Sequence, residues 1–150
     1  MLRIVLAALH LLALGIGLSA VWSRGHALRG PLDGASLRRA FAADGVWGAA
    51  GALWLGTGLW RLFGETEKAT SYYFQNHIFL TKMGLFLLIV GLEVWPIITF
   101  TRWRRAARGV TPPDPVTARR VATISSVQAV LVVLIVFLAV AMARGYGARG

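Results

Sequence analysis

The 150-residue sequence has no cysteine and few acidic residues, with 6 Asp and Glu against 16 Lys and Arg. The lack of cysteine excludes a disulfide framework, thiolate metal sites and thiol catalysis, so redox chemistry would need a bound cofactor. Charged residues of both signs are also scarce, at 15% of the chain, whereas 57% is hydrophobic. Soluble domains of this size are rarely so apolar, and the composition therefore indicates a membrane protein.

Four segments are long and apolar enough to cross a bilayer: Ile4–Trp22, Phe41–Phe63, Ile78–Phe100 and Val121–Ala143. About 20 helical residues, at 1.5 Å each, span a hydrocarbon core of roughly 30 Å. A transmembrane barrel would instead need shorter segments in which apolar and polar residues alternate, and these segments do not alternate. We predict an all-α, integral membrane four-helix bundle that forms a single domain over residues 1–150.

Arginines concentrate in two of the three connecting segments, which the topology places on one side of the membrane. They are Arg24, Arg29, Arg38 and Arg39 in the first, and Arg102, Arg104, Arg105, Arg108, Arg119 and Arg120 in the last. The positive-inside rule makes this side cytoplasmic and turns both termini and the Glu65–His77 loop outward. We therefore expect a multi-pass protein of the bacterial inner membrane, with its termini in the periplasm. The net charge of +10 then reflects topology and not nucleic-acid binding, although Arg102 to Arg108 could also attract anionic lipid.

Residues that favour helix ends and bends mark the predicted elements. Asp114 suits the N-cap and Pro115 the first position of the fourth helix, and Asn76 could cap the third. Pro96 predicts a bend within the third helix. The pattern of Ser36–Ala43 fits a short interfacial helix that leads into the second membrane helix.

Small residues fill the second predicted helix, where they would let a neighbouring helix approach closely. We therefore predict that this helix is central and the most buried of the four, with a cofactor slot against the same residues as an alternative. The glycines are Gly45, Gly48, Gly51, Gly56 and Gly58.

His10 and Lys82 form a candidate site near the outer face. By helical rise, His10 lies about 9 Å and Lys82 about 6 Å below that surface, so both could occupy one layer of the bundle. A neutral imidazole can ligate haem iron, and an ammonium group can pair with a porphyrin carboxylate. The alternatives are that Lys82 extends outward to water and that His10 bonds a neighbouring helix.

Glu93 follows Lys82 by eleven residues, so both project from one helix face about 16 Å apart and cannot pair directly. Other polar residues lie at the same cytoplasmic depth as Glu93, namely Asp44, Ser125, Ser126 and Gln128. We predict a polar cluster there. It is either structural, with Glu93 bonded to Arg102 or to hydroxyls, or part of a proton path toward Lys82.

Four short stretches carry a family resemblance: Ala8-Leu9-His10, Phe41-Ala42-Ala43-Asp44, Trp54-Leu55-Gly56-Thr57-Gly58-Leu59-Trp60-Arg61 and Lys82-Met83-Gly84-Leu85-Phe86. Through them nearly the whole chain resembles a bacterial family of small predicted membrane proteins of unknown function. The first and third helices are also loosely similar to HemJ-type protoporphyrinogen oxidase, which has Ala-Leu-His in its first helix and a lysine opening a later one. That resemblance implies haem b binding and places His10 and Lys82 at the site.

These observations lead to one principal hypothesis and two alternatives. We expect the protein to bind haem b or another amphipathic redox ligand near its outer face, with His10 as the ligand of the haem iron and Lys82 beside it. Alternatively, it is a non-catalytic accessory subunit of a larger membrane complex, or a small proton-coupled transporter that acts as an oligomer. Whether it is an enzyme stays open, and its expected partners are the lipid bilayer and other membrane subunits or further copies of itself.

Overall fold

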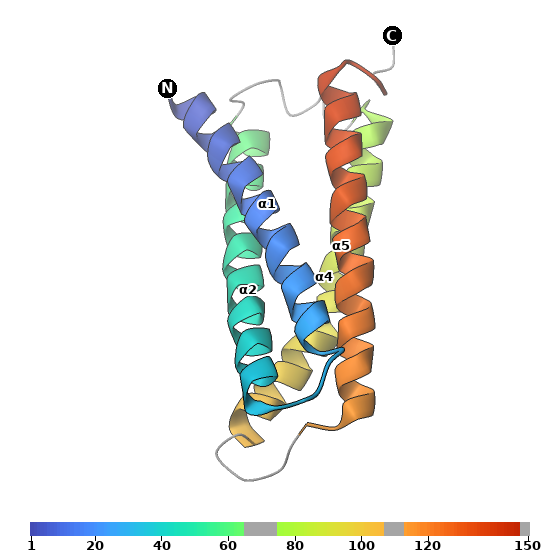
Figure 1. Cartoon of the computed structure of the whole chain (residues 1–150). Coiled ribbons are helices and arrows are strands. Elements are labelled where there is room, and N and C mark those ends of the chain that lie inside the picture. Colours follow the sequence, from blue (N-terminus) through green and yellow to red (C-terminus); the bar gives the residue numbers. More distant parts are fainter. Residues whose placement is uncertain (65–74, 107–112, 148–150) are drawn as a thin grey trace.

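The described part of the chain forms four long helices that run alternately in opposite directions (Figure 1). The computed structural model describes residues 1–64, 75–106 and 113–147. The helices are α1 (Leu2–Ala27), α2 (Gly34–Phe63), α4 (His77–Ala106) and α5 (Pro115–Ala143). Both chain termini lie at one end of the bundle, which we call the termini end, and the opposite end is the arginine end (Figure 1). The predicted all-α four-helix architecture is confirmed, and most of the Glu65–His77 loop falls outside the described residues.

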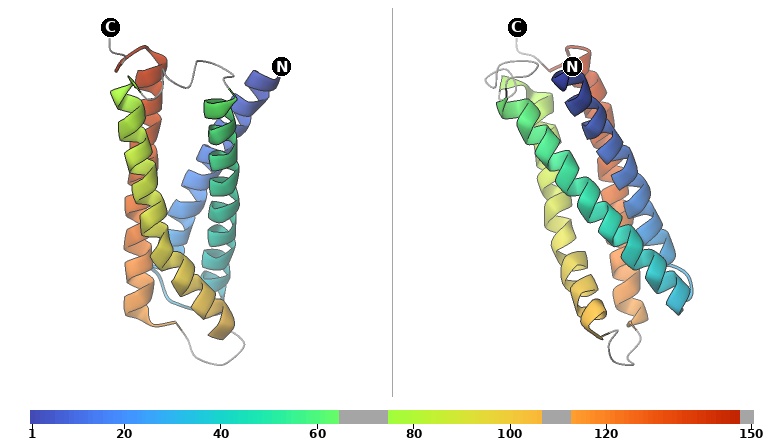
Figure 2. Two further views of the ribbon diagram at one scale, coloured as in Figure 1. Left: turned by 180° about the vertical axis from the view of Figure 1, so that it is seen from behind. Right: turned by 90° about the vertical axis from the view of Figure 1, so that its left-hand side faces the viewer.

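Three of these helices, α1, α4 and α5, are long and apolar enough to cross a membrane by length and composition. The remaining helix, α2, is 30 residues long but is not among them. It lies beside α1, with which it makes the most extensive helix contacts in the bundle (Figures 1 and 2). A helical membrane protein therefore fits the structure, and α2 packs on the more apolar α1.

Side-chain caps define where the helices begin. The Asp33 carboxylate accepts a hydrogen bond from the Ser36 backbone N–H at 2.7 Å, and this bond starts α2 at Gly34. The predicted separate helix at Ser36–Ala43 is therefore wrong, because this segment is the first part of one continuous α2. Asp114 caps α5 in the predicted way, and Asn76 Oδ1 accepts the backbone N–H groups of Ile78 and Phe79 at the start of α4.

The helices pack as two antiparallel pairs, α1 with α2 and α4 with α5. The two pairs are connected by α1, which also packs on α5. Figure 1 shows the two pairs close together toward the arginine end and diverging toward the termini end. Pro96 lies inside α4, and Figure 2 shows this helix changing direction in its second half. A buried apolar cluster of Ile89, Leu131, Val132 and Ile135 holds the middle of the bundle.

Four glycines of α2 do not pack against the described part of the chain, whereas Gly58 faces His10, whose Cε1 would lie 3.1 Å from a Cβ atom placed there. A Cβ atom placed at Gly45, Gly48, Gly51 or Gly56 would meet no heavy atom within 4 Å. The buried side of α2 is instead made by Ser36, Ala40, Ala43, Ala50 and Thr57. The prediction that α2 is the central and most buried helix is therefore wrong, and its small residues leave one face of the helix open.

Candidate functional site

A charged side chain, Arg24, lies at the centre of the arginine end. The apolar segment ends at Trp22, and we assigned Arg24 to the following loop, but α1 continues to Ala27 and buries this side chain completely, at 0% exposure. An arginine in a loop would be exposed to solvent, whereas the Arg24 side chain faces the interior of the bundle. The loop assignment of Arg24 is therefore wrong.

Every N–H group of the Arg24 guanidinium has an acceptor. The Nε atom donates to Ser125 Oγ at 3.0 Å, and Nη1 donates to Asp44 at 3.0 Å and to Glu93 at 2.7 Å. The Nη2 atom donates to the second Glu93 oxygen at 3.0 Å and to Gln128 Oε1 at 2.8 Å. Arginine has five N–H donors in a planar fork, so this set is complete, and the two bonds to Glu93 form a bidentate pair.

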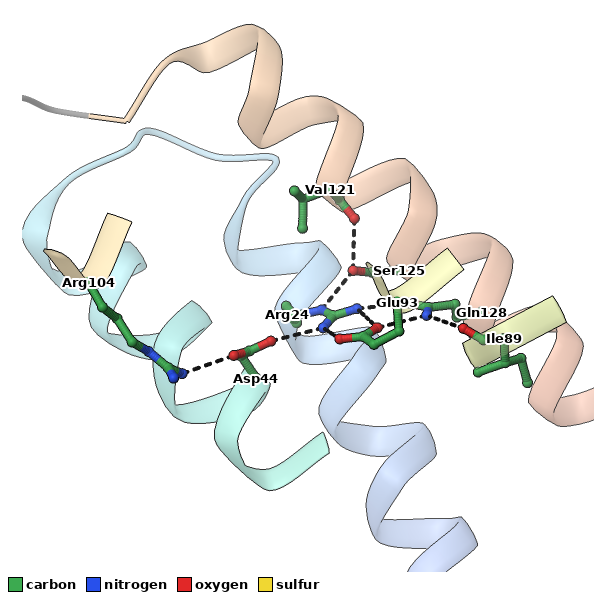
Figure 3. A network of polar contacts seen from close by, with 8 residues as sticks. All are labelled: Arg24, Asp44, Ile89, Glu93, Arg104, Val121, Ser125 and Gln128. Atoms are coloured by element: carbon green, nitrogen blue, oxygen red, sulfur yellow. Dashed lines mark hydrogen bonds and ion pairs between the residues drawn. The ribbon is translucent and has the colours of Figure 1, made fainter. Parts of the chain in front are cut away.

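The network around Arg24 joins all four helices (Figure 3). Asp44 on α2 also accepts a bond from Arg104 of α4 at 2.9 Å, and the Gln128 amide of α5 donates to Glu93 at 2.7 Å. Two arginines and two carboxylates thus balance in charge. The structure brings together the predicted cluster of Glu93, Asp44 and Gln128, and it gives Glu93 the partner Arg24 in place of Arg102.

The positions of the acidic residues in the sequence point to Arg24 as their partner. Two carboxylates, Asp44 and Glu93, lie in otherwise apolar helices at one depth, and buried charges need a nearby cation. Arg24 is close to that depth on α1 and follows its apolar segment by only two residues. Counting charges within the bundle, instead of assigning each arginine to a loop, would have selected it.

An apolar layer separates this network from the termini end. In the network, the Gln128 amide also donates to the backbone oxygen of Ile89 at 3.2 Å. The Ile89 side chain belongs to the apolar cluster, against which Leu14, Leu18, Leu85 and Phe86 also pack. On α4 the layer residues Leu85, Phe86 and Ile89 lie between Lys82 and Glu93 in the sequence, and the proton path toward Lys82 stays a prediction.

A cavity of about 140 Å³ lies between the helix pairs on the far side of that layer. All four helices contribute to its wall, and His10 of α1 and Lys82 of α4 both line it. The structure therefore brings the two predicted site residues to one space. Other lining residues are Trp54, Leu55, Gly58, Leu59, Arg61 and Leu62 of α2, Phe79, Met83 and Phe86 of α4, and Met142 of α5.

Hydrogen bonding fixes the tautomer of His10. Its Nδ1 lies 2.9 Å from Thr57 Oγ1, and that hydroxyl donates to the backbone oxygen of Leu53 at 2.7 Å. Because the hydroxyl proton is used in that bond, the Thr57 oxygen accepts from His10 Nδ1–H, so a neutral ring would be the Nδ1–H tautomer. The ring also packs against Trp54, with 5.5 Å between ring centroids.

Lys82 is half-buried and directed at an aromatic ring. Its Nζ atom lies 5.4 Å from the centroid of the Phe79 ring, and Phe79 is only 5% exposed. A cation over a ring face is attracted by the ring quadrupole. This placement brings the ammonium group to the cavity wall.

The residues that line the cavity suit a haem better than a bare metal ion. Residues 1–64, 75–106 and 113–147 contain no cluster that could hold a bare metal ion, since no three His, Cys, Asp or Glu side chains come together there. The chemistry of His10 and Lys82 fits a haem, with an imidazole for the iron and an ammonium for an acid group. The space of about 140 Å³ is smaller than the roughly 300 Å³ at which ligand pockets begin, so a porphyrin would require the helix pairs to separate.

Comparisons with known proteins identify the family of the chain. No curated protein and no solved structure matches it, so the looser similarity to HemJ-type oxidases finds no support there. A family model described as "Predicted membrane protein (DUF2214)" matches residues 2–147. Since this match covers almost the entire sequence, the chain belongs to the DUF2214 family of predicted membrane proteins.

Proposed function

We propose that this membrane protein binds an amphipathic ligand in the cavity at the termini end, and that haem b is the redox-active ligand to test first. The observation that carries the proposal is the meeting of His10 and Lys82, from different helix pairs, at one cavity with largely apolar walls. Buried ionisable groups in a membrane domain are costly, and they mark functional sites more often than packing alone would explain.

Each residue has a role in this proposal. His10 would offer Nε2 to the iron, because its Nδ1–H is directed to Thr57, a second-shell bond that orients the ring. Lys82 would neutralise an acid group on the ligand periphery. Space for a porphyrin would come from widening the cavity between the helix pairs, while the Arg24 network holds the arginine end together.

The orientation in the membrane follows from charge in this proposal. The arginine end carries the basic side chains that the positive-inside rule assigns to the cytoplasm. The cavity would then open in the outer half of a bacterial inner membrane. A ligand that is itself amphipathic could reach it from the lipid phase without crossing water.

Absorption spectroscopy tests the haem component. The purified protein, expressed with added haem, should show a Soret band that shifts on dithionite reduction, and His10→Ala should lose that band because the axial nitrogen is gone. His26, which is exposed near the end of α1 at the arginine end, provides the matched control, since His26→Ala should leave the spectrum unchanged. A wild-type protein without a Soret band would rule out haem.

A second candidate function is assembly with another membrane helix, as expected for an accessory subunit or a homo-oligomer. The open Cβ positions of Gly45, Gly48 and Gly56 favour it, because small residues on an exposed helix face allow close helix approach. The low apolarity of α2 relative to its neighbours also favours a protein partner over lipid. Gly48→Leu should abolish association in native gels or crosslinking, whereas Gly84→Leu, on an open face of α4, should not.

A further inference from the structure

The cavity is also lined by a second basic residue, Arg61 in the last turn of α2. Arg61 is half-buried and reaches the cavity from the α1–α2 pair, whereas Lys82 reaches it from α4 on the other pair. With His10, three nitrogen-bearing side chains from three helices line one space. Among the described residues that form its wall, Arg61 and Lys82 are basic and none is acidic.

The remainder of the wall is apolar and adaptable. Leu55, Leu59, Phe86 and the two methionines Met83 and Met142 provide it. Methionine side chains are flexible and fill irregular gaps, which suits a ligand with a hydrocarbon part. A cavity that combines cations with such walls matches a molecule that is anionic at one end and apolar at the other.

A further polar group on the wall is also consistent with an oxygen-rich ligand. The indole nitrogen of Trp54 is buried, and it has no hydrogen-bond acceptor in the described part of the chain. An indole N–H can only donate, so an acceptor oxygen on a ligand would satisfy it. Trp54 itself lines the cavity and contacts the His10 ring.

From these observations we infer that the cavity recognises the acid group, a phosphate or a carboxylate, of an amphipathic ligand, through Arg61 and Lys82 together. The planar guanidinium can bind two oxygens of one acid group, and the ammonium acts as a compact second charge. An entering acid group can join the contacts that both cations already make. This inference rests on the proposed function and names its ligand class, and it does not require the ligand to be haem.

Ligand titrations in a neutral maltoside detergent test the inference. The probes are dodecyl phosphate, dodecyltrimethylammonium and inorganic phosphate, with affinity measured by calorimetry. Dodecyl phosphate should bind in one-to-one stoichiometry, and Lys82→Gln and Arg61→Gln should each weaken it roughly tenfold or more, as expected for the loss of a charge-assisted bond. Arg144→Gln, at an exposed cation of the termini end outside the cavity wall, should leave the affinity unchanged.

Each outcome has a defined meaning. Equal binding of dodecyl phosphate by wild type and by the Lys82→Gln/Arg61→Gln double variant would overturn the inference, because uptake would then reflect the micelle. Inorganic phosphate binding as tightly as dodecyl phosphate would overturn its apolar part and indicate a site for free anions. Equal binding of the cationic probe would overturn the charge selectivity. Lys82→Arg and Arg61→Lys, which preserve charge, should retain most of the affinity and so separate a loss of recognition from a loss of folding.

His10→Ala separates this inference from haem binding. The imidazole would coordinate iron but is not needed to hold a phosphate, so His10→Ala should lose a Soret band and keep dodecyl phosphate binding. A wild-type protein that lacks a Soret band but binds dodecyl phosphate would leave the acid-group site intact and remove haem alone.

Discussion

Replacing Arg24 by methionine should destabilise the bundle more than any other single change of a charged residue. Methionine keeps much of the aliphatic length but removes all five donors that the guanidinium offers to Asp44, Glu93, Ser125 and Gln128. The side chains of Glu93 and Asp44 are only 16% and 13% exposed, so the two carboxylates would be left largely desolvated. Breaking a buried ion pair in this way costs about 3–5 kcal/mol.

A matched control lies in the same network. Arg104 also bonds Asp44, at 2.9 Å, but its side chain is 51% exposed. A solvent-exposed ion pair is worth about 0–1 kcal/mol, so Arg104→Met should have a small effect. Arg24→Lys should fall between the two, because an ammonium has three donors and cannot form the bidentate contact with Glu93.

Reversible unfolding in mixed micelles of detergent and dodecyl sulfate, followed by far-ultraviolet circular dichroism, gives the required free energies. Adding Glu93→Gln to Arg24→Met should recover part of the lost stability, with a coupling of roughly 1–3 kcal/mol, because it removes the charge left unpaired. Equal losses for Arg24→Met and Arg104→Met would refute the reasoning, since they would show that burial of Arg24 contributes nothing.

Two further predictions concern the helix ends. Gly147 has a φ of +80° and a Cβ there would lie 2.6 Å from Ile78 Cγ1, whereas Gly145, at φ +89°, has open space around it. Gly145→Ala should therefore lower the free energy of unfolding only by the left-handed backbone penalty of about 1–2 kcal/mol. Gly147→Ala should lower it by more and should expose the C-terminal turn to limited proteolysis. Equal effects of the two variants would contradict the packing argument. Backbone hydrogen bonds from Ser36 and Thr117 lower the pKa values of the capping carboxyls Asp33 and Asp114 below their ordinary value. The stabilisation that these two ionised caps provide is therefore present above about pH 4, and it is lost as the pH falls through the lowered pKa values. An Asp33→Asn/Asp114→Asn variant keeps a capping oxygen at each position but cannot titrate. Its acid unfolding curve, measured by circular dichroism, should be flatter than that of the wild type.

Local chemistry explains why much of the fold could be predicted from the sequence. Long apolar segments and the N-cap pattern at Asp114-Pro115 depend on residues near one another in the chain, and both are present in the structure. The wrong prediction about the glycines of α2 involves contacts between helices. Whether the glycines of α2 face a neighbour or open space depends on how the helices rotate about their axes, which no single helix pattern contains.

The two polar regions show the same limit in different ways. Helical rise places His10 and Lys82 at similar depths, and the structure brings both to one cavity. Depth alone did not reveal Arg61, which lies at the end of α2 where an interfacial arginine is ordinary. It also did not reveal Arg24, because an arginine just past an apolar segment resembles a topological charge until the helix is known to continue through it.

The most direct test of the central claim, that the cavity at the termini end holds an amphipathic acid, is native mass spectrometry of the protein released from its own membranes. The account predicts one bound acidic amphiphile for each protein molecule, retained at collision energies that strip loosely attached lipid and lost in the Lys82→Gln/Arg61→Gln variant. A wild-type spectrum with only the bare protein, or with the same adducts as the variant, would contradict it.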